Sequence, residues 1–153
     1  MKIESLTEEE TSMILKLREE NIPKYIKGSI PVTREVLDKL IKNGEDVTKV
    51  DTSQITVMSR LFFENKTFNQ DISNWDTSNV EDMNSMFYGA RSFNQPLSNW
   101  DVSQVTDMSW LFYGASSFNQ DISNWKIDSL EYYDDIFYNC PIEEQYKPEK
   151  LRK

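Results

Sequence analysis

Apolar residues recur along the middle of the chain with a fixed step of 25 residues. Tryptophan stands at Trp75, Trp100 and Trp125, and the same step separates phenylalanines and methionines. A period of this length predicts a repeat protein, in which stacked repeats cover one another's apolar faces. Four copies extend from about residue 46 to about residue 140. The other apolar registers are Phe62, Phe87, Phe112 and Phe137; Met58, Met83 and Met108; and Phe68, Phe93 and Phe118.

The spacing of apolar residues changes within each copy. In "DISNW", Ile72 and Trp75 suggest a short extended piece, whereas the apolar spacing from Val80 to Phe87 matches one face of a helical turn. Gly89 follows this turn at a point where a chain reversal often needs a positive φ. We therefore expect an α/β repeat of about four coils, each with a short strand and a short helix or 3₁₀ turn.

The segments before and after the repeats predict covers for the two ends of the stack. Residues 1–45 contain two candidate helices: "TEEETSMILKLREEN" begins with a capping box from Thr7 to Glu10, and "TREVLDKLIKNG" ends at Gly44. We expect them to form a helical N-terminal cap, with residues 46–140 as the repeat domain. Residues 141–153 contain two prolines and mixed charges, which favour a C-terminal cover that ends in a frayed tail.

The repeat unit "FNQDISNWDTSNVEDMNSMFYGARS" resembles that of the BspA-type bacterial leucine-rich-repeat surface proteins, in the 25-residue variety abundant in mycoplasmas. "LEYYDDIFYNC" places Cys140 at that family's small buried position. The resemblance covers about 95 residues of this chain. It implies a short leucine-rich-repeat-like solenoid that recognises proteins, in some members by adhesion to host molecules. The surface proteins carry an export signal, for which the start "MKIESLTEEE" has no apolar segment.

Residues that recur in every copy favour structural roles over a unique site. We expect hydrogen bonds to the backbone from two asparagine rows, one at Asn69, Asn94 and Asn119 and the other at Asn74, Asn99 and Asn124. The repeated aromatic and methionine side chains are expected in the core, with the alternative of a sugar platform for the tryptophans. The predicted core residues are Trp75, Trp100, Trp125, Phe87, Phe112, Phe137, Met83 and Met108.

Aspartates also recur in register, at Asp51, Asp76 and Asp101 and at Asp71 and Asp121. Rows of carboxylates bind calcium in some repeat proteins, but Pro96 and Lys126 interrupt these rows. Capping of backbone N–H groups at the corners is the favoured role, and we expect no metal and no cofactor. The chain lacks histidine, the usual catalytic base, and contains no P-loop, GxGxxG or CxxC motif. We therefore expect no enzymatic activity.

The net charge of −9 is concentrated on the repeats. Residues 46–139 contain 14 acidic and 5 basic residues, whereas the other parts of the chain are nearly balanced. Such a field repels nucleic acid and anionic membranes and attracts a basic protein. One cysteine, Cys140, is compatible with a reducing compartment. We expect a cytoplasmic protein that does not insert into membranes, although a fragment of a longer secreted protein would have the same features.

Positions that break the repeat are the best candidates for a binding site. Trp110 occupies a register that holds Arg60, Ser85 and Asp135 in the other copies, and Tyr132 replaces an aspartate. An exposed tryptophan with a nearby tyrosine and an acidic rim is typical of a protein interface. Packing of Trp110 against a neighbouring coil or the C-terminal cover is the alternative. The predicted partner-binding residues are Trp110, Tyr132, Asp107, Glu131, Asp134, Asp135 and Tyr113.

Three functions remain open at this point. The first is a non-catalytic protein-recognition module. The second is an intracellular acidic inhibitor or immunity protein for a basic toxin or nuclease, suggested by the charge and the small size. The third is a fragment of a host-binding surface adhesin. The sequence identifies neither the partner nor the oligomeric state.

Overall fold

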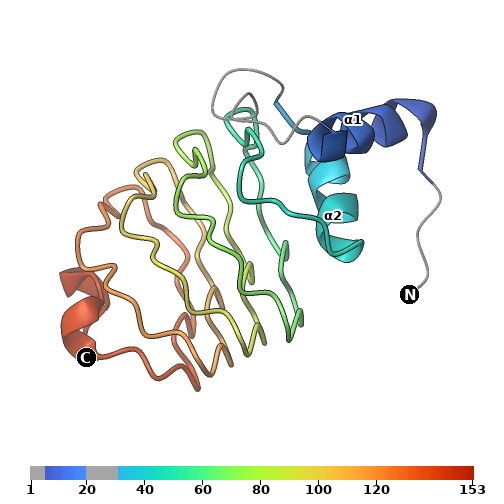
Figure 1. The fold of residues 1–153 in the computed structure, drawn as a ribbon. Coiled ribbons are helices and arrows are strands. Elements are labelled where there is room, and N and C mark those ends of the chain that lie inside the picture. The colour runs from blue at the N-terminus through green and yellow to red at the C-terminus, as the bar shows by residue number, and fades with distance from the viewer. Residues whose placement is uncertain (1–5, 20–30) are drawn as a thin grey trace.

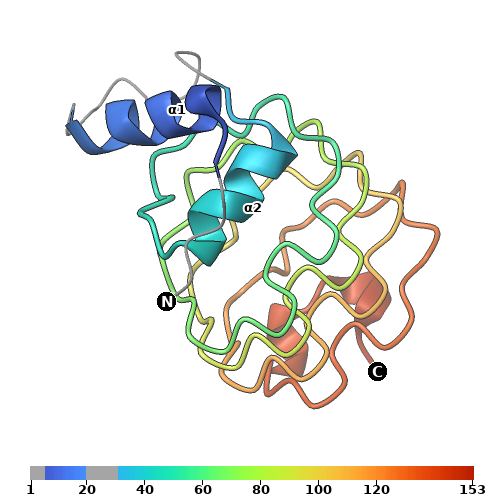
Figure 2. The ribbon, with the colours of Figure 1, turned by 90° about the vertical axis from the view of Figure 1, so that its right-hand side faces the viewer.

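The computed structural model describes residues 6–19 and 31–153. Its elements are the helices α1 (Glu8–Glu19) and α2 (Arg34–Lys42) and the short 3₁₀ helices η2 (Glu144–Tyr146) and η3 (Glu149–Leu151). Between α2 and η2 the chain runs through coils that lie side by side, with the α-helices at one end of the stack and the 3₁₀ helices at the other (Figure 1). Seen along the stack, the coils superimpose as rings around a common interior (Figure 2).

A one-way ladder of backbone hydrogen bonds joins each coil to the next. In the first three coils, the N–H groups of four alternating residues donate to carbonyl groups of the following coil over 2.7 to 2.9 Å. A true parallel sheet would exchange bonds in both directions at every second residue. In this protein, bonds in both directions occur at one parallel bridge per junction, such as that between Asp82 and Asp107. The ladder donors are Met58, Arg60, Phe62 and Glu64; Met83, Ser85, Phe87 and Gly89; and Met108, Trp110, Phe112 and Gly114.

The prediction of an α/β leucine-rich-repeat solenoid is therefore wrong. Among the described residues there are isolated β-bridges but no sheet, and no α-helix lies beyond Lys42. The extended piece expected in "DISNW" is a turn, in which the Trp75 N–H donates to the Ile72 carbonyl over 3.1 Å. The Asp71 carboxylate accepts from the Ser73 N–H over 3.0 Å. Aspartate, serine and asparagine favour such local bonds over the ladder of a strand.

The short helix expected after each corner is also absent from the described coils. Its place is taken by consecutive turns, because the backbone adopts a positive φ twice in each copy. In the second coil these residues are Ser85, at φ 56°, and Gly89, at φ 67°. A helix needs an unbroken run of right-handed residues, so each positive φ ends it. The apolar spacing that suggested a helix fits these turns equally well.

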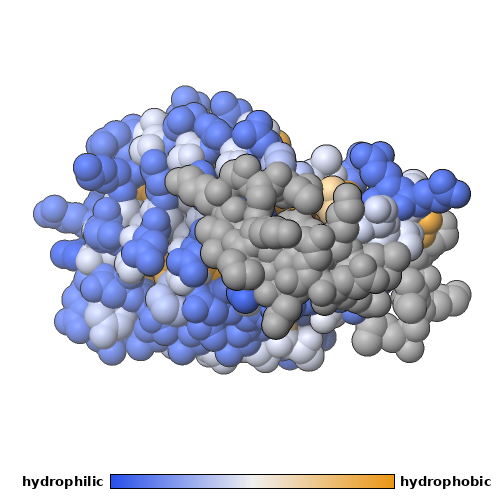
Figure 3. Space-filling view, turned by 45° about the horizontal axis from the view of Figure 1, so that its top comes forward, coloured by the Kyte–Doolittle hydropathy of each residue, from blue (hydrophilic) through white to orange (hydrophobic). Residues whose placement is uncertain are grey.

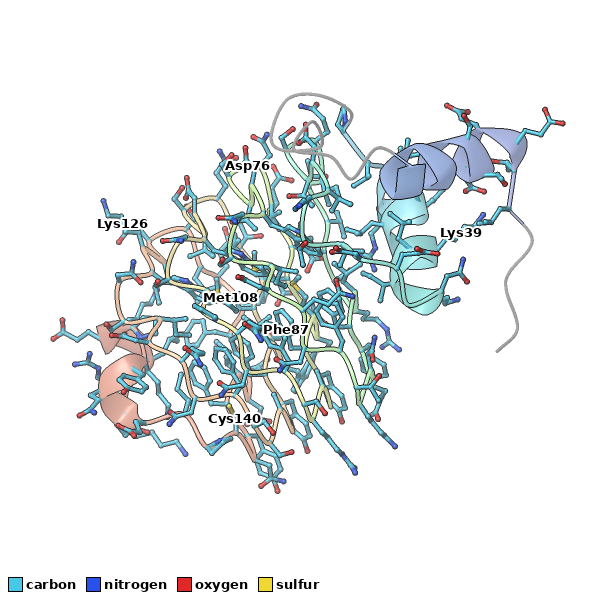
Figure 4. All side chains as sticks on the ribbon, viewed as in Figure 1. Lys39, Asp76, Phe87, Met108, Lys126 and Cys140 are labelled. Carbon is cyan, nitrogen blue, oxygen red and sulfur yellow. The ribbon has the colours of Figure 1, made fainter. Side chains whose placement is uncertain are left out.

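Aromatic rings stack along the interior and hold the coils in register. Phe87 lies between Phe62 and Phe112, with ring centroids 5.2 and 5.4 Å away, and Trp75 stacks on Trp100 at 6.4 Å. Phe87 and Met108 lie inside the stack in Figure 4. Because identical side chains meet at each junction, burial and ring stacking add to one another at every step.

The two N-terminal helices form where the capping signals predict them. The Thr7 N–H donates to the Glu10 carboxylate over 2.8 Å, and the Glu10 N–H donates to the Thr7 hydroxyl over 3.2 Å, which completes the capping box. Helix α2 begins after Thr33, whose hydroxyl accepts from the Val36 N–H, and Gly44 follows it at φ 68°. Residues 1–5 and 20–30 of the predicted cap, and the side chains of Ile14 and Leu17, lie outside the described residues.

Contacts connect these helices to each other and to the first coil. The Lys39 ammonium donates to the Glu10 carboxylate over 2.8 Å (Lys39 is labelled in Figure 4). The Arg34 guanidinium donates to the carbonyls of Val57 and Ser59 over 3.1 and 2.7 Å. These carbonyls begin the one-way ladder, so Arg34 supplies donors that no earlier coil provides.

Residues 141–153 lie against the last coil. The Ile122 N–H donates to the Tyr146 carbonyl over 2.9 Å, and Ile142 and Lys147 are buried. The Arg152 guanidinium donates to the carbonyls of Lys147 and Gln145, which fixes η3 beside η2.

Candidate protein-binding face

One side of the stack carries the exposed apolar side chains. We call the outward side of residues 56–64, 81–89, 106–114 and 131–139 the turn face. All large hydrophobic side chains that are exposed in the described part of the chain belong to it: Val57, Trp110, Tyr132, Tyr133 and Tyr138. In Figure 3, with the top of Figure 1 brought forward, the coloured part of the surface, outside the grey atoms, is mostly hydrophilic. Asp76 and Lys126 lie toward that top, whereas Cys140, just after the turn face, lies near the bottom (Figure 4).

Trp110 is the most unusual residue of the turn face. Its side chain is 38% exposed and its φ is 57°. A bulky side chain in this left-handed region costs about 1 to 2 kcal/mol. The equivalent residues Arg60, Ser85 and Asp135 share the conformation, so the fold imposes it at this register whatever the side chain. Trp110 therefore occupies a strained position while remaining largely accessible.

Tyr132 lies on the last coil, the coil that accepts the ladder bond from Trp110. It is 59% exposed, and its carbonyl accepts from the Met108 N–H over 2.8 Å. Tyr132 also forms the parallel bridge with Asp107, whose carboxylate accepts from the Ser109 N–H over 2.8 Å and from the Asn84 amide over 3.1 Å. These bonds hold the Asp107 carboxylate in place on the turn face.

A ladder of aromatic rings borders this region. Tyr113 lies between Tyr88 and Tyr138, with ring centroids 4.6 and 4.7 Å away. Burial among these rings is the largest of the effects that raise the pKa of the Tyr113 hydroxyl, and neighbouring Asp135 adds to them. Tyr113 therefore stays neutral at physiological pH and works as a packed ring of the ladder.

All seven predicted partner-binding residues lie on the turn face of the third and fourth coils. Trp110 and the last coil are directly joined, because the Trp110 N–H donates to the Asp134 carbonyl over 2.8 Å. Glu131, Asp134 and Asp135 are exposed on the last coil. Two exposed tyrosines of the same face, Tyr133 and Tyr138, are not among the seven predicted residues, because their registers hold buried or stacked residues in the earlier copies.

The family model described as "Mycoplasma protein of unknown function, DUF285" matches residues 33–148. The chain belongs to this family. The matched segment contains α2, all four coils and η2, and so includes the whole turn face. No curated protein and no solved structure matches the chain.

In this DUF285 protein the recurring residues hold the coils together. Of the eight predicted core residues, Phe137 is partly buried and the others are buried. Each corner tryptophan donates its indole N–H to a carbonyl of the preceding coil, as Trp100 does to Ile72 over 3.0 Å. The Asn94 side chain accepts from the Asn119 N–H over 3.0 Å. In the second asparagine row, the Asn124 amide donates to the Ser98 carbonyl over 2.9 Å, which is also a bond between neighbouring coils.

The aspartate rows cap corners in the same DUF285 repeats. The Asp101 carboxylate accepts from the Ser103 N–H over 3.0 Å and from the Ser103 hydroxyl over 2.6 Å. This hydroxyl bond is the main reason that the pKa of Asp101 is lowered. Within the described residues, no group of three or more acidic or cysteine side chains is placed to hold a metal ion.

Two further properties bear on the chemistry of the chain. Burial raises the pKa of the Cys140 thiol to about 11, and its sulfur donates to the Phe118 carbonyl over 3.4 Å. A thiol with this pKa is a poor nucleophile at neutral pH. Neither described helix has the length and apolar character that crossing a bilayer requires.

Proposed function

We propose that this protein is a non-catalytic module that recognises another protein through the turn face of its third and fourth coils. The observation that carries the proposal is the confinement of the exposed large apolar side chains of the described residues to this one face. Exposed aromatic residues that gather on one side of a polar surface mark interaction sites. The resemblance of the repeat unit to that of BspA-type surface proteins supports recognition over catalysis.

Trp110 and Tyr132 are the proposed anchors. Trp110 keeps a strained φ of 57° and a side chain that is 38% exposed, although a serine occupies the same register in the second coil. The fold imposes this conformation on every copy, so the distinguishing feature of Trp110 is an exposed aromatic side chain at a register that is polar in the other copies. Tryptophan and tyrosine also contribute more binding energy per residue than most side chains.

A basic surface is the proposed partner of this aromatic pair. Asp107, Glu131, Asp134 and Asp135 lie on the same two coils as this pair, and residues 46–139 carry 14 acidic against 5 basic residues. Complementary charge accelerates association and discriminates against acidic partners. A more specific form of the proposal is an inhibitor of a basic protein such as a nuclease, for which this charge is the supporting observation.

The test compares two substitutions on the same face. Trp110→Ser copies the residue of the second coil and should weaken binding by about 2 kcal/mol or more, because it removes a central aromatic anchor. Val57→Ser removes an apolar side chain of similar exposure from the first coil and should leave binding unchanged. The measurement is capture from native cells by the immobilised protein, followed by titration of the captured protein at rising salt.

The proposal predicts a basic partner whose affinity falls as the salt concentration rises. Of the two substitutions, only Trp110→Ser should lower this affinity. Equal capture by the wild type and both variants would place the interface elsewhere. An acidic partner would contradict the proposed role of the rim.

A further inference from the structure

The last coil ends the one-way ladder with unused donors. The N–H groups that would continue the ladder belong to Tyr133, Asp135, Phe137 and Asn139, the equivalents of Met108, Trp110, Phe112 and Gly114. None of these four N–H groups has an acceptor among the described residues. Backbone N–H groups are strong donors that are nearly always paired, so this end of the stack offers several hydrogen bonds in one direction.

At the opposite end of the ladder, a charged side chain pairs with the backbone groups that have no partner coil. There the first carbonyls of the ladder, those of Val57 and Ser59, accept from the Arg34 guanidinium. A cation thus meets the carbonyl end. Because the peptide groups of the ladder point the same way, their dipoles add as they do in a helix, and the N–H end attracts an anion. Alternating right-handed and left-handed residues also form the backbone concavities, called nests, that bind anions. Asp135 and Asn139, at φ 45° and 54°, are the left-handed residues of the last coil.

A pocket of 290 Å³ lies at this N–H end, between the last coil and the C-terminal segment. Three of the four residues with unused donors, Tyr133, Asp135 and Phe137, line it. From the C-terminal segment, which follows the last coil in red in Figure 1, come four basic residues. They are Lys147, Lys150, Arg152 and Lys153.

The basic side chains are already arranged around the pocket. The Lys150 ammonium lies 5.5 Å from the ring centre of Tyr133, and the Lys147 ammonium lies 5.1 Å from that of Phe137. Arg152 is held by its bonds to the Lys147 and Gln145 carbonyls. Lys147 is also paired with Glu144, and the Lys153 N–H donates to the same carboxylate over 3.0 Å, which leaves the Lys150 ammonium as the cation most available to a ligand, with that of Lys153 next.

We propose that this pocket binds the phosphate group of a small phosphate monoester. Phosphate oxygens accept both from backbone N–H groups in a nest and from lysine ammonium groups. The aromatic rings of Tyr133 and Phe137 supply apolar surface for the organic part of the ligand, which a volume of 290 Å³ accommodates. The pocket shares Asp135 with the acidic rim of the Trp110 surface, but neither Trp110 nor Tyr132 lines it, so either proposal can fail without the other.

The experiment titrates ¹⁵N-labelled protein with inorganic phosphate and with phenyl phosphate at constant ionic strength. We expect saturable chemical-shift changes at the amides of Tyr133, Asp135 and Phe137, with tighter binding of phenyl phosphate because its ring contacts the aromatic side chains. Absence of saturable shifts at these amides would overturn the proposal. So would concentration-dependent self-association that shifts them without phosphate, because a second chain would then continue the ladder.

Three variants test the contribution of charge. Lys150→Gln combined with Lys153→Gln should weaken phenyl phosphate at least about fivefold, because two charge-assisted contacts are removed. Lys126→Gln removes a charge away from the pocket (Lys126 is labelled in Figure 4) and should change affinity less than about twofold, as expected for screened charges. Asp135→Asn tolerates the positive φ and should tighten binding by removing the acid that lines the pocket. Equal weakening by the Lys126 variant would reveal non-specific attraction and contradict the site.

Discussion

The corner tryptophans and Trp110 show how one residue type serves two purposes in this protein. Trp100 is 4% exposed, donates its indole N–H to the Ile72 carbonyl and stacks on Trp75. Trp110 is 38% exposed and adopts a left-handed backbone conformation. The first occupies a register filled by tryptophan in three copies, whereas the second occurs once in its register. The tryptophans that recur in the repeat therefore stabilise the fold, whereas the tryptophan that occurs once in its register lies on the proposed binding surface.

The largest expected effect is a difference in the free energy of unfolding between alanine variants of these two tryptophans. Trp100→Ala should lower the free energy of unfolding by about 3 to 5 kcal/mol, because it opens a cavity in the middle coil and removes the indole bond to the Ile72 carbonyl, which keeps only the bond from the Trp75 N–H. Trp110→Ala should lower it by less than about 1 kcal/mol, since a partly exposed side chain is removed. Urea denaturation followed by circular dichroism measures both. A loss at Trp110 as large as that at Trp100 would make it a core residue and remove it from the binding surface.

A smaller effect tests the backbone that the turn face imposes. Gly114 has a φ of 68°, and a Cβ at this position would meet its nearest neighbour, the Gly89 Cα, at 3.8 Å. There is space for a methyl group, so Gly114→Ala should destabilise only through its conformation, by about 1 to 2 kcal/mol. Gly114→Asn should cost less, because asparagine tolerates this region and Asn139 occupies the same register. Thermal unfolding of the two variants gives the order, and an alanine variant as stable as the wild type would contradict the positive φ.

The smallest effect concerns the corners, where aspartates accept bonds from nearby serines. The folded protein lowers the pKa of Asp101 below its usual value of 3.8, chiefly through the Ser103 hydroxyl. A lowered folded pKa means that the stabilisation is complete above about pH 4 and disappears as the pH falls through the folded pKa. Asp101→Asn keeps the acceptor but cannot titrate, so it should change stability at pH 7 by less than about 0.5 kcal/mol.

The measurement for Asp101 is the free energy of unfolding between pH 2 and pH 7. The variant should lose less stability than the wild type over the acidic part of this range. Ser103→Ala is the matched control, since it removes the hydroxyl bond and leaves the carboxylate. Identical acid sensitivity in all three proteins would show that this corner does not contribute.

Much of the internal order could be predicted from the chain alone. The 25-residue step identified the buried registers, and the capping box of Thr7 and Glu10 located the start of α1. The conformation of each copy could not be predicted in the same way. Apolar residues three and four apart fit both a helix and a series of turns, and only the bonds to the next coil favour the turns. The mistaken strand in "DISNW" has the same origin, because its local bonds compete with pairing along the stack.

The candidate surface was predicted in part. Trp110 and Tyr132 stand out because they break the repeat, and the structure places both on the exposed turn face. The basic pocket has a weak signal in the sequence, the change from acidic repeats to the basic residues after residue 146. That signal does not reveal that these residues fold back onto unused backbone donors. Arg34 likewise has no sequence feature that connects it to carbonyls more than twenty residues away.

The sequence by itself determined the period, the registers that are buried and the concentration of negative charge, since these depend on residue types at fixed spacing. Only the tertiary structure decided that the coils are joined by a ladder that runs in one direction, and therefore that the two ends of the stack differ. The physical reason is that a backbone N–H is present at almost every residue and carries no sequence signature. The direction in which a backbone N–H points, and whether it has an acceptor, depend on how one coil packs against the next.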